Sequence, residues 1–143
     1  MAGDQGAVMG KTILLFVSLC LLIGCSNAVE PPPGAFNYEA YDSTGALGVT
    51  GWLTITITDS SHIAGEWHFK KAGNPEAMGP QLGSGVHTGG FYNGNMNLNL
   101  NPQMIDNNLV LSGTFTGNTY RGKWMWITFA GETNHGSFRA VRE

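Results

Sequence analysis

The chain has 143 residues, of which only 12% are charged, and its formal net charge at pH 7 is −3. Basic residues form no stripe, so nucleic acid and anionic lipid headgroups are poor partners for it. Few general acids and bases are present, and no Ser-His-Asp set has a recognisable context such as Gly-x-Ser-x-Gly. We therefore expect a protein that is not an enzyme, needs no cofactor and binds no nucleic acid.

The first feature along the chain is an uncharged apolar segment from Thr12 to Gly24, which follows Lys11. It is shorter than the roughly 20 residues that a transmembrane helix needs. A short apolar segment behind a positive residue is typical of a secretory signal peptide. We expect residues 1–24 to be such a signal, whose translation starts at Met1 or at Met9. The alternative is a buried helix.

This segment closes on Leu22-Ile23-Gly24-Cys25, which resembles the bacterial lipobox. The resemblance implies cleavage before Cys25, acylation of its thiol and new amine, and attachment to the membrane through this covalent lipid. Several acyl chains anchor a protein stably. Ser26, where aspartate would favour the inner membrane, implies the outer membrane of a Gram-negative cell or otherwise the outer face of the plasma membrane. The alternative is that Cys25 is a plain thiol.

The segment after the cleavage point is expected to be a tether. Cys20 lies in the part that is removed, so the mature chain holds Cys25 alone and forms no internal disulfide. The proline triplet at 31–33 is stiff and extended and would space a domain off the bilayer. We assign residues 25–35 to the lipidated cysteine and this tether, and residues 36–143 to one domain.

From Phe36 onward the apolar residues alternate with polar ones, as in half-buried strands. The clearest cases are Trp52 to Thr58 and Asn95 to Asn101. Gly, Asn and Asp between these segments supply turns. The pattern predicts eight strands, at residues 36–42, 49–58, 62–70, 85–92, 95–101, 108–116, 119–129 and 134–142.

A Gly-x-aromatic motif recurs along these strands. It is found in Gly65-Glu66-Trp67, Gly89-Gly90-Phe91, Gly113-Thr114-Phe115, Gly136-Ser137-Phe138 and Gly122-Lys123-Trp124. The glycine and the aromatic residue of each copy face the same side of their strand. Strand glycines mark bends or close approaches, and their repetition lets a sheet coil until it closes. We predict an all-β fold, an eight-stranded antiparallel up-and-down (meander) β-barrel.

The order of these motifs resembles avidin-like and lipocalin-like barrels, and most closely small bacterial lipoproteins of that shape. The residues that carry the resemblance are Gly51-Trp52, Gly65-Glu66-Trp67, Gly113-Thr114-Phe115 and Gly136-Ser137-Phe138-Arg139-Ala140-Val141-Arg142. It covers nearly the whole mature chain, but its motifs are architectural. It implies a fold and, by itself, no ligand.

The register predicts an interior that is rich in aromatic residues. A small eight-stranded barrel is either filled by its own side chains or holds one small ligand, and the aromatic content fits both. A small hydrophobic or aromatic-stacking ligand would meet a few polar groups among aromatic rings. The ligand-binding candidates are Trp67, His87, Phe91, Tyr120, Trp124, Trp126 and Asn134. The alternative for His87 is a solvated position near a strand end.

Other polar groups are expected on the outside. His62, Glu66 and His68 share one strand face, but Lys70 on that face would repel a cation, so we expect a solvated surface and no metal site. The asparagines at 95, 97, 99 and 101 are expected to keep an outer face wet, with glycan binding or self-association as the alternative. The loop at 70–84 is either a lid over one barrel end or a plain connection.

We expect a membrane-anchored, non-catalytic binding module of the bacterial cell envelope, with a small-ligand pocket or a binding surface on its loops. One alternative is a barrel that binds an envelope or host protein as an inhibitor. Small barrel lipoproteins that inhibit lysozyme carry a Ser-Gly-x-x-Tyr loop, of which Ser112-Gly113-Thr114-Phe115 is only a partial match. Another alternative is a structural envelope lipoprotein with no soluble ligand.

Overall fold

The structure is a computed structural model that describes residues 30–143. The lipobox-like residues Leu22, Ile23, Gly24 and Cys25 lie outside the described residues, as does the expected signal peptide. The strands are β1 (Gly34–Tyr41), β2 (Leu47–Ile57), β3 (His62–Lys71), β4 (Gly83–Tyr92), β5 (Asn95–Asn99), β6 (Asn107–Thr116), β7 (Thr119–Thr128) and β8 (Gly131–Arg142). Within this range, no helix is long and apolar enough to cross a bilayer.

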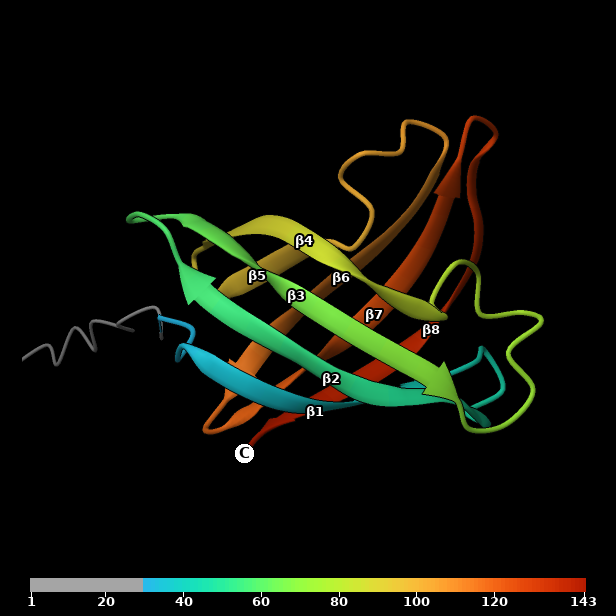
Figure 1. Ribbon diagram of the computed structural model, residues 1–143, viewed down its shortest axis with the longest axis horizontal. Helices are drawn as coiled ribbons and strands as arrows, with labels where there is room; N and C mark the ends of the chain where they lie inside the picture. The colour runs from blue at the N-terminus through green and yellow to red at the C-terminus, as the bar shows by residue number, and fades with distance from the viewer. Residues whose placement is uncertain (1–29) are drawn as a thin grey trace, which may run out of the picture.

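The described strands form a closed barrel. Each strand pairs antiparallel with the next, and β1 pairs with β8 to complete the ring (Figure 1). This confirms the predicted eight-stranded up-and-down β-barrel, with strand limits that differ from the predicted ones by a few residues. Because the ring is closed, the sheet of the described residues offers no free edge to another chain.

The two ends of the barrel differ in their connections. The start of β1 lies at the end where β2–β3, β4–β5 and β6–β7 are joined by short turns, which we call the tether end. Asn93 and Gly94, both with positive φ, make the tight turn between β4 and β5. The other end, which we call the loop end, carries the longer connections at 42–46, 72–82 and 100–106 and the turn at 129–130 (Figure 1).

The 72–82 connection packs into the loop end of the barrel. Met78 and Gln81 are fully buried there. Tyr38 Oη donates a hydrogen bond to Gln81 Oε1 over 2.9 Å, and Gln81 Nε2 donates to the Met78 carbonyl oxygen over 2.6 Å. The segment that was predicted to be a lid or a plain connection thus contributes two side chains to the core.

The repeated glycines lie where the backbone of a neighbouring strand leaves no room for a Cβ. A Cβ at Gly65 would overlap the Thr54 carbonyl oxygen on β2, and one at Gly136 would overlap the Tyr41 carbonyl oxygen on β1. The same overlap with a neighbouring backbone carbonyl occurs at Gly51, Gly89, Gly113 and Gly122. The glycines therefore allow the tight coiling that the repeat predicted.

Candidate functional site

Side chains occupy the middle of the barrel. The Tyr38 and Phe69 rings stack with centroids 4.0 Å apart, and Tyr120 meets Phe138 edge-on at 4.7 Å. Aliphatic residues of β2, β5 and β6 complete this core. Its largest fully buried members are Trp124, Tyr38, Tyr120, Phe36, Phe69, Leu53, Ile55, Ile63, Met78, Met96, Leu98 and Leu100.

Polar atoms of the interior rings make hydrogen bonds that reach across a whole strand. Trp124 Nε1 on β7 donates to the Tyr41 carbonyl oxygen on β1 over 2.8 Å, passing Gly136 on β8. Trp67 Nε1 on β3 donates to the Leu100 carbonyl oxygen, just after β5, over 2.8 Å, passing Gly85 on β4. We call these contacts strand-spanning hydrogen bonds.

Two further interior residues repeat this arrangement. His87 Nε2 on β4 lies 2.7 Å from the Thr54 carbonyl oxygen on β2, with Gly65 of β3 between them. Tyr120 Oη on β7 lies 3.0 Å from the Met96 carbonyl oxygen on β5 and 3.2 Å from the Leu111 carbonyl oxygen on β6, and its one proton is shared between these two acceptors. In all four contacts the ring reaches past the neighbouring strand to a backbone carbonyl two strands away in the barrel. The ring therefore links strands that do not pair directly with each other.

The structure distributes the predicted ligand-binding residues over the barrel wall, and Trp67 and Phe91 line two different grooves. Trp67, His87, Tyr120 and Trp124 are buried in the core. Phe91 and Trp126 pack against this core while partly exposed. Trp126 Nε1 donates to Asn107 Oδ1 over 2.7 Å, and half-buried Asn134 donates through Nδ2 to the Ala77 carbonyl oxygen over 2.7 Å. The polar contacts of these side chains hold the protein together.

His87 has an incomplete set of partners. The carbonyl of Thr54 accepts only a proton-bearing nitrogen, so the neutral ring carries its proton on Nε2. Nδ1 is then an acceptor, and it is buried without a hydrogen-bond partner among the described residues. Burial lowers the pKa of His87 below the ordinary value of 6.5, and the bond to Thr54 opposes this shift in part. The core thus favours the neutral imidazole.

This position predicts that acid destabilises the barrel through His87. Since folding lowers its pKa, the unfolded chain binds more protons than the folded chain below pH 6.5. The contribution of the neutral imidazole to the free energy of unfolding is therefore fully present above pH 6.5. It falls as the pH decreases, with a slope of at most about 1.4 kcal/mol per pH unit for one group. Urea unfolding at pH 7.5 and 5.5 measures this difference.

The matched control for the pH effect is a variant without the buried imidazole. His87→Leu should flatten the dependence between pH 7.5 and 5.5, although it lowers stability at both values by leaving the Thr54 carbonyl unpaired. The remaining histidines, His62, His68 and His135, are exposed and stay in both proteins. An unchanged pH slope in His87→Leu would contradict this role.

The outer face of β1 to β4 presents an aromatic residue among polar ones. Asn37, Trp52, His68 and Ser84 are successive partners across these four strands and so form one row. The Trp52 and His68 rings lie at 20° to each other with centroids 6.1 Å apart, and 39% of Trp52 is exposed. Two grooves of about 460 and 440 Å³ share these two rings as lining.

Trp52 was not predicted as a site residue, although the sequence contains a signal for it. In Trp52 to Thr58 the alternation puts Leu53 and Ile55 on the inner face and Trp52 with threonines on the outer face. A large aromatic residue among the polar positions of an alternating strand is the feature to notice. In the Asn ladder, Asn95 and Asn97 are exposed as predicted, with Met96 and Leu98 buried between and beside them, whereas Asn99 and Asn101 are half-buried.

The candidate metal ligands His62, Glu66 and His68 are all exposed. His62 Nδ1 pairs with Asp59 Oδ1 over 2.8 Å in the turn before β3. Among the described residues, no three His, Cys, Asp or Glu side chains are grouped so that they could hold a metal ion.

The chain was also compared with known proteins. Neither the protein-family models, nor the curated proteins, nor the solved structures gave a match. The functional argument therefore depends on the residues of this chain.

Proposed function

We propose that this protein is a membrane-anchored, non-catalytic lipoprotein of the bacterial cell envelope, and that its barrel is a binding module. The observation that carries the proposal is the apolar segment ending in Leu22-Ile23-Gly24-Cys25, a short distance before the barrel. Residues 34–142 close the ring by themselves. Removal of residues 1–24 and acylation of Cys25 would therefore leave every strand pair intact.

Mass spectrometry of the mature amino terminus, after expression in a Gram-negative host, tests the anchoring. We expect the wild-type chain to begin at Cys25 and to carry acyl groups there. Cys25→Ser should retain residues 1–24 and carry no lipid, because serine lacks the thiol that is acylated. Cys20→Ser is the matched control and should be processed normally. Normal cleavage in Cys25→Ser, or an unmodified Cys25 in the wild type, would contradict the proposal.

Binding is proposed for the outer surface of the barrel. The side chains that fill the middle leave the loops and the outer sheet face for a partner. The low charged fraction of 12% and the solvent exposure of His62, Glu66 and His68 support a non-catalytic role. The row through Trp52 is the place where an aromatic ring and hydrogen-bonding groups adjoin two grooves.

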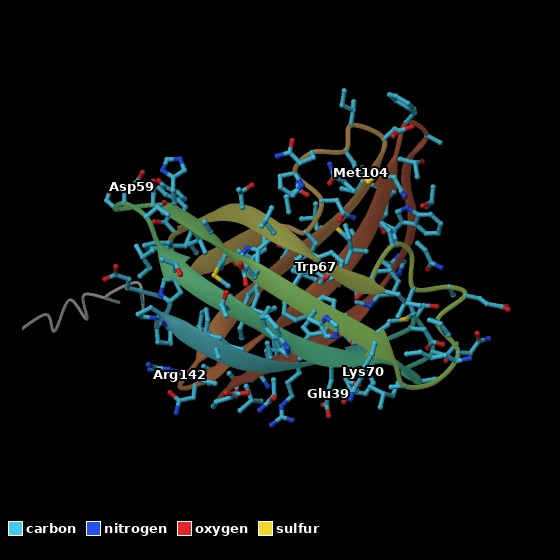
Figure 2. All side chains as sticks on the ribbon, viewed as in Figure 1. Glu39, Asp59, Trp67, Lys70, Met104 and Arg142 are labelled. Carbon is cyan, nitrogen blue, oxygen red and sulfur yellow. The ribbon has the colours of Figure 1, made fainter. Side chains whose placement is uncertain are left out.

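A second candidate is protein binding through the loop end. Ile105 and Phe129 are 89% and 81% exposed, and the pairing of Asn107 with Thr128 brings their two connections together. Met104 belongs to the same 100–106 connection, at the opposite end from Asp59 (Figure 2). Exposed apolar clusters mark protein interaction sites. A chain anchored through its amino terminus would point this cluster away from the membrane.

A further inference from the structure

The two grooves beside Trp52 and His68 form one continuous candidate site on the outer sheet face. The first is lined by residues of β1, β2 and β3, and the second by residues of β2, β3 and β4. Trp52 and His68 line both. Neighbouring strands lie about 4.8 Å apart, so the row from Asn37 to Ser84 spans about 14 Å. Each groove has the volume of a small-molecule site, roughly 300–1,000 Å³.

The lining combines one aromatic platform with many hydrogen-bonding groups. Asn37 and Thr50 in the first groove and Ser84 in the second supply amide and hydroxyl groups that both donate and accept. Glu39 and Lys70, both labelled in Figure 2, add a carboxylate and an ammonium group to the lining of the first groove. Tyr41 Oη donates to Glu39 Oε2 over 2.8 Å, which holds that carboxylate in position.

We propose that this Trp52–His68 surface binds a neutral saccharide chain; the inference rests on the proposed binding function and names its ligand class. A pyranose ring has an apolar face of C–H groups that packs on an aromatic ring, and a rim of hydroxyls that both donate and accept hydrogen bonds. The surface offers both kinds of contact. Its row is long enough for more than one sugar ring.

The charges of the lining distinguish this ligand from others. Glu39 in the first groove and Glu66 in the second would repel a polyanion, while Lys70 gives the first groove a charge of the opposite sign as well. A purely apolar ligand would cover amide, hydroxyl and carboxylate groups without satisfying them, which costs free energy. A neutral polyol satisfies donors and acceptors alike and meets no net repulsion.

Titration of the full chain in detergent with cellohexaose, maltohexaose and chitohexaose tests the inference. We expect saturable binding of at least one hexasaccharide, measured by calorimetry and by a change in tryptophan fluorescence. Trp52→Ala should weaken this binding about tenfold or more, which corresponds to about 1.4 kcal/mol. Trp52→Phe keeps a ring and should weaken it less. Thermal unfolding of both variants checks that the barrel stays folded.

Phe129→Ala is the control, because it removes an aromatic ring that is more exposed than Trp52 (81% against 39%) and lies at the loop end, so it should leave hexasaccharide binding unchanged. Absence of binding of all three hexasaccharides at millimolar concentration would overturn the inference, as would wild-type affinity in Trp52→Ala. Binding that is lost in Phe129→Ala but kept in Trp52→Ala would also overturn it, in favour of the loop end. The mass spectrometry of Cys25 does not depend on these titrations. Either the anchoring or the saccharide ligand can therefore be refuted without affecting the other.

Discussion

Alanine at position 136 should lower the free energy of unfolding by about 3 kcal/mol, the upper end of the usual cost of overpacking. The new Cβ would overlap the Tyr41 carbonyl oxygen and the Trp124 indole at the same time. Neither neighbour moves easily, because Trp124 Nε1 donates to that same carbonyl over 2.8 Å. Since domains of this size are stable by only about 5–15 kcal/mol, the loss is large. Urea unfolding at pH 7.5 measures it.

Ser137→Ala is the control for this substitution. Ser137 follows Gly136 on β8 and is exposed, so its replacement should change stability by no more than about 0.5 kcal/mol. The two variants share a strand and differ by one position, so the contrast isolates the inner face. A Gly136→Ala barrel as stable as Ser137→Ala would show that β8 can move away from β1 at little cost, and would refute the close approach as the role of this glycine.

The closed barrel could be predicted because two local patterns agree with it. Alternation in segments such as Asn95 to Asn101 places apolar residues on one face of each strand, and this depends only on the strand period. The Gly-x-aromatic copies at Gly65 and Gly136 predict that the sheet coils, because a glycine within a strand and outside a turn marks a close approach of two strands. Together they decide both the fold class and the inward direction of Trp67 and Trp124.

Three features of the interior could not be predicted, since they depend on contacts between distant residues. Gln81 lies in a Gly- and Pro-containing connection, and only the fold shows that it is buried against Tyr38, 43 residues away. Whether the barrel is filled depends on the sum of all interior volumes, which no single motif contains. The inward direction of His87 was predicted, but its bond to the Thr54 carbonyl was not. That carbonyl is free to accept from His87 because the β2–β3 pairing is interrupted between the Leu53–Trp67 and Thr56–Ala64 pairs.

The candidate site was predictable only in part, for a related reason. Most of the predicted ligand-binding residues, all but Phe91 and Asn134, combine a ring with a polar atom, which is also what a strand-spanning hydrogen bond needs. Trp52 also carries an indole ring, but on the outer face of the barrel. The alternation of residues along its strand is enough to predict this direction. Its partners Asn37 and Ser84 come from strands that are remote in sequence, and only the register aligns them with it.

Trp124→Ala is expected to be the most destabilising of the tryptophan substitutions, with a loss of about 3–5 kcal/mol. Trp124 is fully buried, and its removal leaves a cavity where β7, β8 and β1 meet. It also leaves the Tyr41 carbonyl without its indole donor, which adds to the loss. Trp124→Phe keeps most of the ring volume and removes the N–H group, so it separates the two contributions. Urea unfolding of both variants gives the values.

Trp126→Ala provides the comparison within the same strand. Trp126 is only partly buried, and its Nε1 donates to the side chain of Asn107 on the adjacent β6, so it spans no strand. Its loss should therefore cost clearly less than that of Trp124. If Trp124→Phe unfolds at the wild-type urea concentration, the hydrogen bond to Tyr41 contributes nothing and the ring stabilises the barrel by packing alone. A measurable loss in Trp124→Phe would instead show that a ring reaching across Gly136 couples β7 to β1, and would explain why aromatic residues and glycines recur together in this chain.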